Sequence, residues 1–293
     1  MTIAILIFSE PSLEAYTNVE RLESAAIARG HHVVRLYEPN FSIGDNFIFY
    51  NGEPLPPIDV LIARPNFIEE PSLHTYVMSA LLHAGYRIVN GLPTFVACKN
   101  KLEQTRLFQI HGIPHPQSIL THSPEETLRA AKTLGFPVIL KVAFGALGKG
   151  VFYVADELSC RPIAEYLAIR DRNPVIVQEF IQEADKKDIR AFVVGDEIIA
   201  SMERAAPKGD VRANTSNGGM GRTIELTKTE RELALCVTRL FELEIAGVDL
   251  IRSTRGPLVL EINSNPGFKE LERVTGVDVA GAIVRYAEQS YAA

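Results

Sequence analysis

Three oxygen-bearing side chains near the carboxyl end have the types and spacing of a metal site. Two apolar runs, 248–251 and 258–262, flank the residues STRGP, a pattern that predicts a β-hairpin or a closely related strand pairing. Glu261 and Asn263 lie two residues apart and project from one strand face, which Asp249 on the first strand can face. Converging oxygen ligands suit Mg²⁺ and substrate phosphates. The alternative is an exposed strand face with scattered polar residues.

A glycine-rich stretch in the middle of the chain, FGALGKG, has the composition of a phosphate-binding loop. Gly145, Gly148 and Gly150 allow close approach of the backbone to a ligand and leave N–H groups for phosphate oxygens. A Walker A loop is excluded because the Ser/Thr is missing and a strand follows, so a hairpin lying over phosphates is the closer analogue. Lys141, in the preceding strand PVILKV, needs an anionic partner. A glycine-rich turn without a ligand is the alternative.

A third candidate element is the apolar strand VIVQEFI, residues 175–181, which ends in Gln178, Glu179 and Phe180. A carboxylate and backbone groups beside apolar walls can hold an adenine and its ribose. A plain sheet edge is the alternative.

Charged residues also gather on a second predicted hairpin, which turns at Gly195-Asp196. Asp188 and Arg190 share a face of its first strand, and Arg204 lies on the second. Arginine suits bidentate capture of a carboxylate or phosphate. Singly, each arginine is more often a surface charge, but their grouping beside the carboxylate trio favours an anion site.

The stretch 208–222 is too polar for a core and too long for a tight turn, so it reads as a functional or mobile loop. It contributes Arg212, Asn214 and Asn217 to the same set of polar groups.

The elements that must position these groups begin with a strand–helix–strand unit of the doubly wound type. The first strand is followed by FSEPSLEA, which has no glycine, so a Rossmann dinucleotide site is disfavoured. Arg64 ends a later strand, where open α/β sheets present ligand groups; a surface salt bridge is the alternative. We expect strands at 3–9, 32–36, 59–64 and 87–90, helices at 17–29, 72–84, 99–110 and 228–244, and a loop at 50–57.

Composition sets limits on the function. The chain has 293 residues, 46% of them hydrophobic, which allows two or three compact units with large cores. The net charge of -6 argues against a nucleic-acid binder. Three widely spaced cysteines favour reduced thiols in the cytosol over zinc or disulfides. The first residues read as a strand and not as a signal peptide, and no apolar stretch approaches membrane-spanning length.

The ordered set of motifs resembles that of the ATP-grasp carboxylate–amine ligases, and within them the RimK group, which includes α-L-glutamate ligases acting on ribosomal protein S6. The motifs are Lys141 in its strand, the glycine-rich hairpin, QEF, KDIR, VRAN, AGVDL and LEINSNPG. The similarity covers nearly the whole chain. It implies an α/β (α+β) ATP-grasp fold, with an N-terminal open parallel-sheet domain at 1–97, a central subdomain at 98–180 and a C-terminal subdomain at 181–293.

The resemblance also implies roles for individual residues. Lys101 and Lys141 would bind the nucleotide phosphates under the glycine-rich loop, and Glu179 and Phe180 would contact adenine. Asp188 would hold the ribose or a nearby substrate amine. Arg190 and Arg204 would anchor a substrate carboxylate or the transferring phosphoryl group. Arg212, Ala213 and Asn214 would line the nucleotide pocket, and Asp249, Glu261 and Asn263 would bind two Mg²⁺ or Mn²⁺ ions.

The function expected from these features is ATP-dependent joining of an amino acid, L-glutamate, to a peptide or protein through an acylphosphate. Other amino acids or acceptors are the first alternative: a lysine- or arginine-pathway carrier protein, a glutathione-like dipeptide or a peptide natural product. A nucleotide-binding regulator without turnover is the second. We expect a cytoplasmic homo-oligomer, dimer or tetramer, that binds neither nucleic acid nor membrane.

Overall fold

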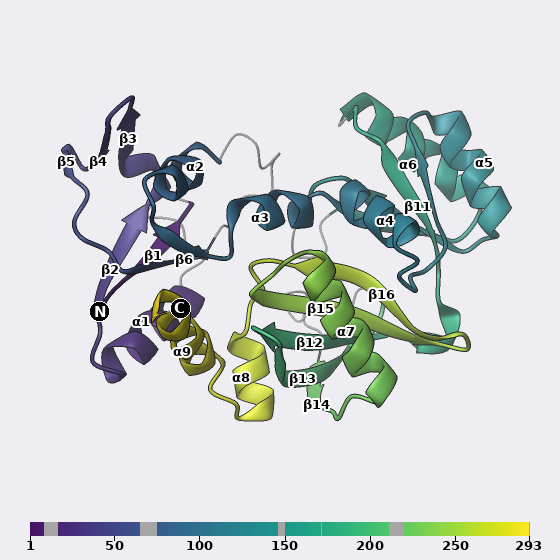
Figure 1. The fold of residues 1–293 in the computed structure, drawn as a ribbon. Coiled ribbons are helices and arrows are strands. Elements are labelled where there is room, and N and C mark those ends of the chain that lie inside the picture. Colours follow the sequence, from purple (N-terminus) through teal and green to yellow (C-terminus); the bar gives the residue numbers. More distant parts are fainter. Residues whose placement is uncertain (9–16, 65–74, 146–149, 171, 211–219, 293) are drawn as a thin grey trace.

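The amino-terminal part of the chain forms a four-stranded parallel sheet in the order β2 (His32–Tyr37), β1 (Thr2–Ile7), β6 (Val60–Arg64) and β7 (Arg87–Val89) (Figure 1). The computed structural model describes residues 1–8, 17–64, 75–145, 150–170, 172–210 and 220–292. Helices α1 (Thr17–Ala28) and α2 (Tyr76–His83) accompany the sheet. The apolar run of β1 is buried, as parallel strands between two layers are. The predicted strand–helix–strand unit is confirmed.

A small antiparallel sheet replaces part of the predicted loop at 50–57. Strands β3 (Phe41–Gly44), β4 (Phe47–Tyr50) and β5 (Glu53–Pro54) pair in sequence order after the short 3-10 helix η1 (Glu38–Asn40). The loop prediction was wrong for Tyr50 and for Glu53–Pro54, which lie in strands, because Asn51 and Gly52 both have positive φ and form a two-residue hairpin turn between them.

The predicted helix at 99–110 forms as α4 (Lys101–Ile110), which starts two residues later than predicted and follows a separate helix, α3 (Leu92–Lys99). Asn100 separates them with an extended backbone, and its side chain accepts hydrogen bonds from the backbone N–H groups of Leu102 and Glu103. This is the geometry of a helix N-cap, which sets the start of α4 and thereby the position of Lys101. Figure 1 shows α3 and α4 running from the amino-terminal sheet towards the second sheet.

The second sheet is antiparallel, in the order β10 (Val151–Val154), β9 (Val138–Val142), β11 (Val175–Glu179) and β8 (Ser118–Thr121). Helices α5 (Pro124–Leu134) and α6 (Glu157–Arg170) pack together, and their apolar residues share a core with the sheet. Ser123 caps α5 through a hydrogen bond from the Glu126 N–H, as its sequence predicts. Strand β11 ends at Glu179, so Phe180 lies beyond it.

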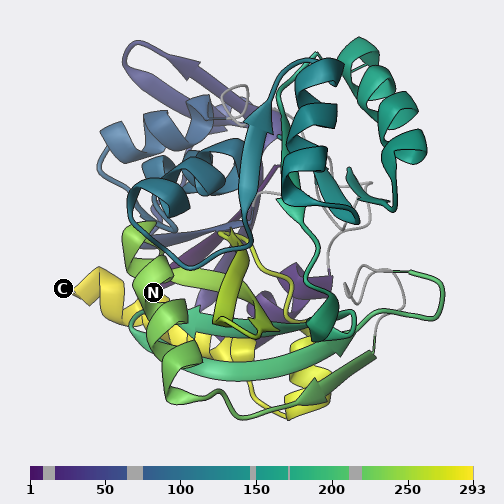
Figure 2. The ribbon, with the colours of Figure 1, turned by 90° about the vertical axis from the view of Figure 1, so that its right-hand side faces the viewer.

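The third sheet has five antiparallel strands in the order β14 (Met220–Thr223), β13 (Glu197–Ala205), β12 (Lys187–Val194), β15 (Ile245–Ser253) and β16 (Gly256–Asn263). Figure 2 shows the second sheet standing above these strands. Both predicted hairpins, β12–β13 and β15–β16, are confirmed. Helix α7 (Lys228–Leu240) ends four residues earlier than predicted, where Phe241 is the C-cap and Glu242 has a positive φ that an α-helix cannot continue. Most of the predicted loop at 208–222 lies outside the described residues, and its last three residues belong to β14.

The carboxyl-terminal helices α8 (Lys269–Thr275) and α9 (Val279–Ala292) return to the amino-terminal sheet. One hydrophobic cluster contains residues of β1, β6, β12, β13 and α9, and α9 packs against α1. The other face of the third sheet shares a core with α7. The carboxyl ends of β1 and β6 therefore lie against the segment that follows β16. Within the described residues, no helix has the length and apolar character needed to cross a membrane.

The side chain of Asn90 joins the amino-terminal sheet to the β15–β16 hairpin through hydrogen bonds. Its Nδ2 donates to the carbonyl oxygens of Ile245 (2.8 Å) and Ser264 (2.7 Å), and its Oδ1 accepts from the N–H groups of Glu244 and Ile245, both at 2.8 Å. Asn90 is buried. Its side chain thus sets the distance between the amino-terminal sheet and the start and end of the β15–β16 hairpin.

Asn90→Ala is expected to lower the free energy of unfolding by about 2–3 kcal/mol, because it leaves several buried backbone groups without partners. Urea denaturation measures this change. Asn51→Ala is unsuitable as a control because of its positive φ, whereas Asp196→Ala, in the exposed β12–β13 turn, removes a polar side chain with little expected effect. A change below about 0.5 kcal/mol for Asn90→Ala would contradict the role assigned to it.

Candidate active site

The β15–β16 hairpin brings the three predicted metal ligands together. Asp249 and Glu261 are directly opposite each other in the strand pairing, at a bulge that follows Asp249. Asn263 lies on the same face as Glu261, and its Nδ2 donates to Glu261 Oε1 at 3.2 Å. Two carboxylates and one amide oxygen therefore lie on one face of the hairpin.

Glu261 is the acid at the centre of a cluster of cations. Lys101 Nζ lies 3.6 Å from its Oε2, on the helix that Asn100 caps. Burial opposes ionisation of Glu261, but Lys101, Lys141 and Arg190 outweigh it and lower its pKa to about 2. Glu261 is therefore ionised at neutral pH, as an oxygen ligand for a metal must be.

Lys141 projects from β9 towards the same region. Burial lowers the pKa of its ammonium group to about 8, an effect that Glu261 opposes and Lys101 reinforces. The apolar strand β9 thus contains a buried ammonium group, that of Lys141, which an anionic ligand would stabilise. Lys101 Nζ also donates to the carbonyl oxygen of Gly145 at 3.2 Å, which ties the start of the glycine-rich stretch to α4.

Asp249 belongs to a buried network of two arginines and two aspartates. Arg190 binds both oxygens of Asp249, with Nη2 2.8 Å from Oδ2. Arg204 Nη2 lies 3.0 Å from Asp249 Oδ1, and Arg204 Nε donates to Asp188 Oδ1 at 2.6 Å. Burial disfavours the charged form of Arg204, but the two carboxylates outweigh it and raise its pKa. The four charges sum to zero, which is the condition for burying them.

Gly247 makes room for this network. A Cβ at this position would lie 2.6 Å from Pro266 Cβ and 3.0 Å from Arg190 Nη1. Both distances are shorter than ordinary contacts, so a larger residue would displace either the arginine or the segment after β16.

Glu179 and Phe180, which were predicted to contact adenine, have side chains that interact with other residues of the protein. The Glu179 carboxylate accepts from the Gln117 N–H at 2.7 Å and pairs with Arg255, so its side chain is committed to the protein. Phe180 packs edge-on against Tyr153, with ring centroids 5.1 Å apart. Gly150 has φ +82°, and a Cβ there would lie 2.3 Å from Val142 Cγ2. Gly148, Arg212, Ala213 and Asn214 lie outside the described residues.

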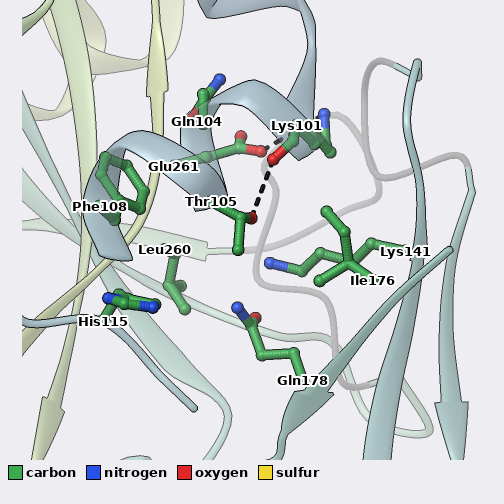
Figure 3. Close-up of a pocket in the computed structure, with 10 residues that line it drawn as sticks. All are labelled: Lys101, Gln104, Thr105, Phe108, His115, Lys141, Ile176, Gln178, Leu260 and Glu261. Carbon is green, nitrogen blue, oxygen red and sulfur yellow. Dashed lines mark hydrogen bonds and ion pairs between the residues drawn. The ribbon is translucent and has the colours of Figure 1, made fainter. Parts of the chain in front are cut away.

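A small pocket between α4, β9, β11 and β16 is shown in Figure 3. Lys141 points into it from β9, and Lys101 and Glu261 meet at its opposite side. Phe108, Ile176 and Leu260 supply apolar walls. Such a mixture of flat apolar surface and convergent charges is typical of a small-molecule site. The lining residues are Lys101, Gln104, Thr105, Phe108, His115, Lys141, Ile176, Gln178, Leu260 and Glu261.

Sequence reasoning found Lys101 but missed the other pocket-lining residues of α4, which are Gln104, Thr105 and Phe108. Gln104 is buried; its Oε1 accepts from the Ile262 N–H at 2.9 Å, and its Nε2 donates to the Ile262 carbonyl at 3.0 Å. It therefore locks α4 to the metal-ligand strand. The available signal was a glutamine one turn beyond Lys101, which becomes informative only when that face of the helix is known to be buried.

Comparison with known proteins decides the family. Residues 98–287 match the RimK-like ATP-grasp domain. The chain belongs to the RimK-like ATP-grasp family. A ribosomal protein bS6–L-glutamate ligase of Escherichia fergusonii is 36% identical over 281 residues, covering 92% of this chain and 91% of that protein. A probable α-L-glutamate ligase of an Enterobacter species has the same identity and coverage.

Solved ATP-grasp structures share the fold. D-cycloserine synthetase DcsG superposes with a TM-score of 0.77 at 16% identity, covering 99% of both chains. The ATP-grasp ligase PsnB, solved with a minimal precursor, has a TM-score of 0.75 at 20% identity and covers 98% of both chains. The predicted ATP-grasp fold and RimK-like membership are confirmed, and the chain is an ATP-dependent ligase. The RimK-like family uses ATP and Mg²⁺.

The described residues fit these cofactors. Glu261, Asp249 and Asn263 offer hard oxygen atoms of the kind Mg²⁺ prefers, and Lys101 and Lys141 offer positive charge for phosphates. The individual roles of these residues, like the domain boundaries at 97 and 180, stay predictions.

Proposed function

We propose that this chain uses ATP to join L-glutamate, through its amino group, to the terminal carboxylate of a peptide or protein. The observation that carries the proposal is the 36% identity to a bS6–L-glutamate ligase over 92% of the chain. The converging cations and carboxylates of the β15–β16 hairpin support it independently, because they suit a reaction that moves a phosphoryl group. A ribosomal acceptor would place the reaction in the cytoplasm.

We assign the pocket of Figure 3 to the nucleotide. Phe108, Ile176 and Leu260 would pack against the base, whereas Lys101 and Lys141 would bind phosphate oxygens. The backbone of Gly145 and Gly150 would approach the phosphates from the other side; Gly148, between them in the sequence, lies outside the described residues. Glu179 and Phe180 would act mainly through the backbone at the end of β11, since the Glu179 side chain is already paired.

Asp249, Glu261 and Asn263 would hold the divalent cations, Mg²⁺ or Mn²⁺, with two ions as the proposed number. When bound, these ions would neutralise charge on the phosphate oxygens. Arg190 and Arg204, which Asp249 holds beside these strands, would stabilise the negative charge that develops during phosphoryl transfer.

The chemistry follows from the weakness of a carboxylate as an electrophile. Transfer of the ATP γ-phosphoryl group to the acceptor carboxylate gives an acylphosphate, and the glutamate amine attacks its carbonyl carbon with release of phosphate. Lys141 and the arginines would hold the anionic groups in place. Asp188, paired with Arg204, would hold either the ribose or the incoming amine.

The test is a substrate screen with the purified protein, ATP and Mg²⁺. A peptide carrying the carboxyl-terminal residues of bS6 is incubated with L-glutamate, L-lysine or buffer, and ADP release and the peptide mass are measured. ADP release and a mass increase of one glutamyl residue, both dependent on L-glutamate, would support the proposal. Turnover only with lysine, a dipeptide or another peptide would move the assignment to the other substrates of this family. The same preparation also tests the predicted homo-oligomer by light scattering.

Nucleotide affinity is expected to fall by up to about tenfold per pH unit above about pH 8. The pKa of Lys141 lies below its ordinary value, so the ammonium group is charged at neutral pH and loses its proton as the pH rises through about 8. The triphosphate favours the charged form. Titration calorimetry between pH 7 and pH 10 measures the dependence.

In Lys141→Arg the fall should disappear, since arginine stays charged throughout this range. Lys228→Arg, at the exposed start of α7, is the matched control and should keep the wild-type profile. A Lys141→Arg protein with the same pH dependence as the wild type would remove Lys141 from the nucleotide site.

A further inference from the structure

Arg64 is a buried cation that the proposed mechanism does not use. It ends β6 at the carboxyl edge of the amino-terminal parallel sheet and is only 6% exposed. Its Nη2 donates to the carbonyl oxygen of Pro266 at 3.2 Å, and its guanidinium carbon lies 5.5 Å from the centre of the Phe268 ring. Pro266 is three residues beyond Asn263, so Arg64 lies beside the segment that follows the proposed metal ligands.

In the described part of the chain no carboxylate balances the charge of Arg64, in contrast to the charges of Arg190 and Arg204. Burial lowers the pKa of its guanidinium to about 10, whereas the carboxylates beside Arg204 raise the pKa of that group despite burial. Arg190 and Arg204 are paired with Asp249 and Asp188. Among the described residues, Arg64 has no carboxylate within ion-pair distance. A buried charge without a counter-ion is costly, which indicates a site built for a ligand.

The surroundings of Arg64 add positive charge and a polar group. Burial lowers the pKa of Lys99 to about 8, and Lys101 and Arg64 lower it further, so these three cations lie within electrostatic reach of one another. The Ser264 hydroxyl is buried and, in the part of the chain that the structure describes, has no hydrogen-bond partner. The three cations, close to one another and to the proposed metal strand, form a surrounding that suits an anion.

We propose that Arg64 binds the carboxylate that the amino-acid substrate keeps when its amino group reacts. This inference rests on the proposed function, and it names the group that recognises one of its two substrates. Ligands of open α/β sheets bind beyond the carboxyl ends of the strands, and Arg64 lies at that position in β6. Toward the described residues Arg64 makes one hydrogen bond, to Pro266, and its further N–H groups could make a bidentate contact with a carboxylate.

Arg64 would then have a different role from that of Arg190 and Arg204. Arg190 and Arg204, which lie with Asp249 at the metal strands, would serve the phosphoryl transfer. Arg64, fixed to the backbone three residues after Asn263, would hold the amino acid with its amine towards the reacting carbonyl carbon. An amino acid bound in this way is selected by its negative charge, so amides of the same size should be poor substrates.

The experiment compares L-glutamate with its α-amide and its γ-amide, in the wild type and in Arg64→Lys and Arg64→Met. In the wild type, one of the two amides should have a kcat/KM about 10- to 100-fold below that of glutamate, the range expected for loss of a charge-assisted hydrogen-bonded pair. That amide identifies the carboxylate. In Arg64→Met, kcat/KM for glutamate should fall by a similar factor, and the discrimination between acid and amide should disappear. Arg64→Lys should retain part of the discrimination between acid and amide.

Binding of ATP provides the control for folding, because Arg64 has no part in the nucleotide pocket. The ATP dissociation constant should stay within about twofold of the wild-type value in both variants, and Arg129→Gln, an exposed arginine of α5, should change neither quantity. Wild-type protein that shows no glutamate-dependent ADP release would refute the proposed function. Active wild-type protein whose discrimination persists in Arg64→Met would overturn the role of Arg64 alone.

Discussion

Glu261→Gln is expected to lower turnover about a thousandfold or more while the fold is retained. Glutamine has nearly the same shape but no charge, so a divalent cation loses a carboxylate ligand and Lys101 loses its ion pair at 3.6 Å. A metal ion contributes several kcal/mol to charge stabilisation in the transition state, and about 4 kcal/mol corresponds to a factor of a thousand in rate. The measurement is glutamate-dependent ADP release at saturating ATP and Mg²⁺.

Two controls define this experiment. Glu126→Gln, an exposed glutamate of α5 paired only with Arg129, should leave turnover unchanged. Thermal unfolding of Glu261→Gln should stay cooperative, and its Mg²⁺ dependence should be shifted to higher concentration. Turnover within about tenfold of the wild type would remove Glu261 from the metal site.

Asp249→Asn is expected to destabilise the fold by about 3–5 kcal/mol and also to abolish turnover. Asp249 is 2% exposed and neutralises Arg190 through both of its oxygens. Asparagine keeps the shape but leaves the network of two arginines and two aspartates with one uncompensated positive charge. Removing one partner of a buried pair costs more than the pair contributes, because the remaining charge stays buried. Urea denaturation measures the loss.

The design separates stability from catalysis. Asp196→Asn, in the exposed turn between β12 and β13, should change neither stability nor turnover. Asp249→Asn protein that unfolds with wild-type stability would show that Arg190 and Arg204 are not buried together with Asp249 as the structure has them. Full activity of that variant would remove Asp249 from the metal site independently.

The strand elements of the candidate site could be predicted because their signals are local. In a β-strand, alternate residues point to one face, so the spacing of Glu261 and Asn263 places them together without knowledge of the rest of the chain. The hairpin turn then brings Asp249 opposite Glu261. The Ser123 cap of α5 and the Gly195-Asp196 turn are equally local, and both formed as predicted. At Asn51-Gly52 the local signal was not used fully: these residues form a hairpin turn between β4 and β5, whereas a loop was predicted.

The sequence alone thus determined the family and the ATP-grasp fold, through the resemblance of its ordered motifs. It also determined the residues that the β15–β16 hairpin presents, because strand periodicity and turn chemistry act over a few residues. Only the tertiary structure decided which charges are compensated. Strand order places β12 beside β15, which pairs Arg190 and Arg204 with Asp249, residues far apart in the chain. The return of α8 and α9 to the amino-terminal sheet sets Pro266 against Arg64. The cost of a buried charge depends on such long-range neighbours, so Arg64, for which the described residues supply no counter-ion, became visible only in the folded chain.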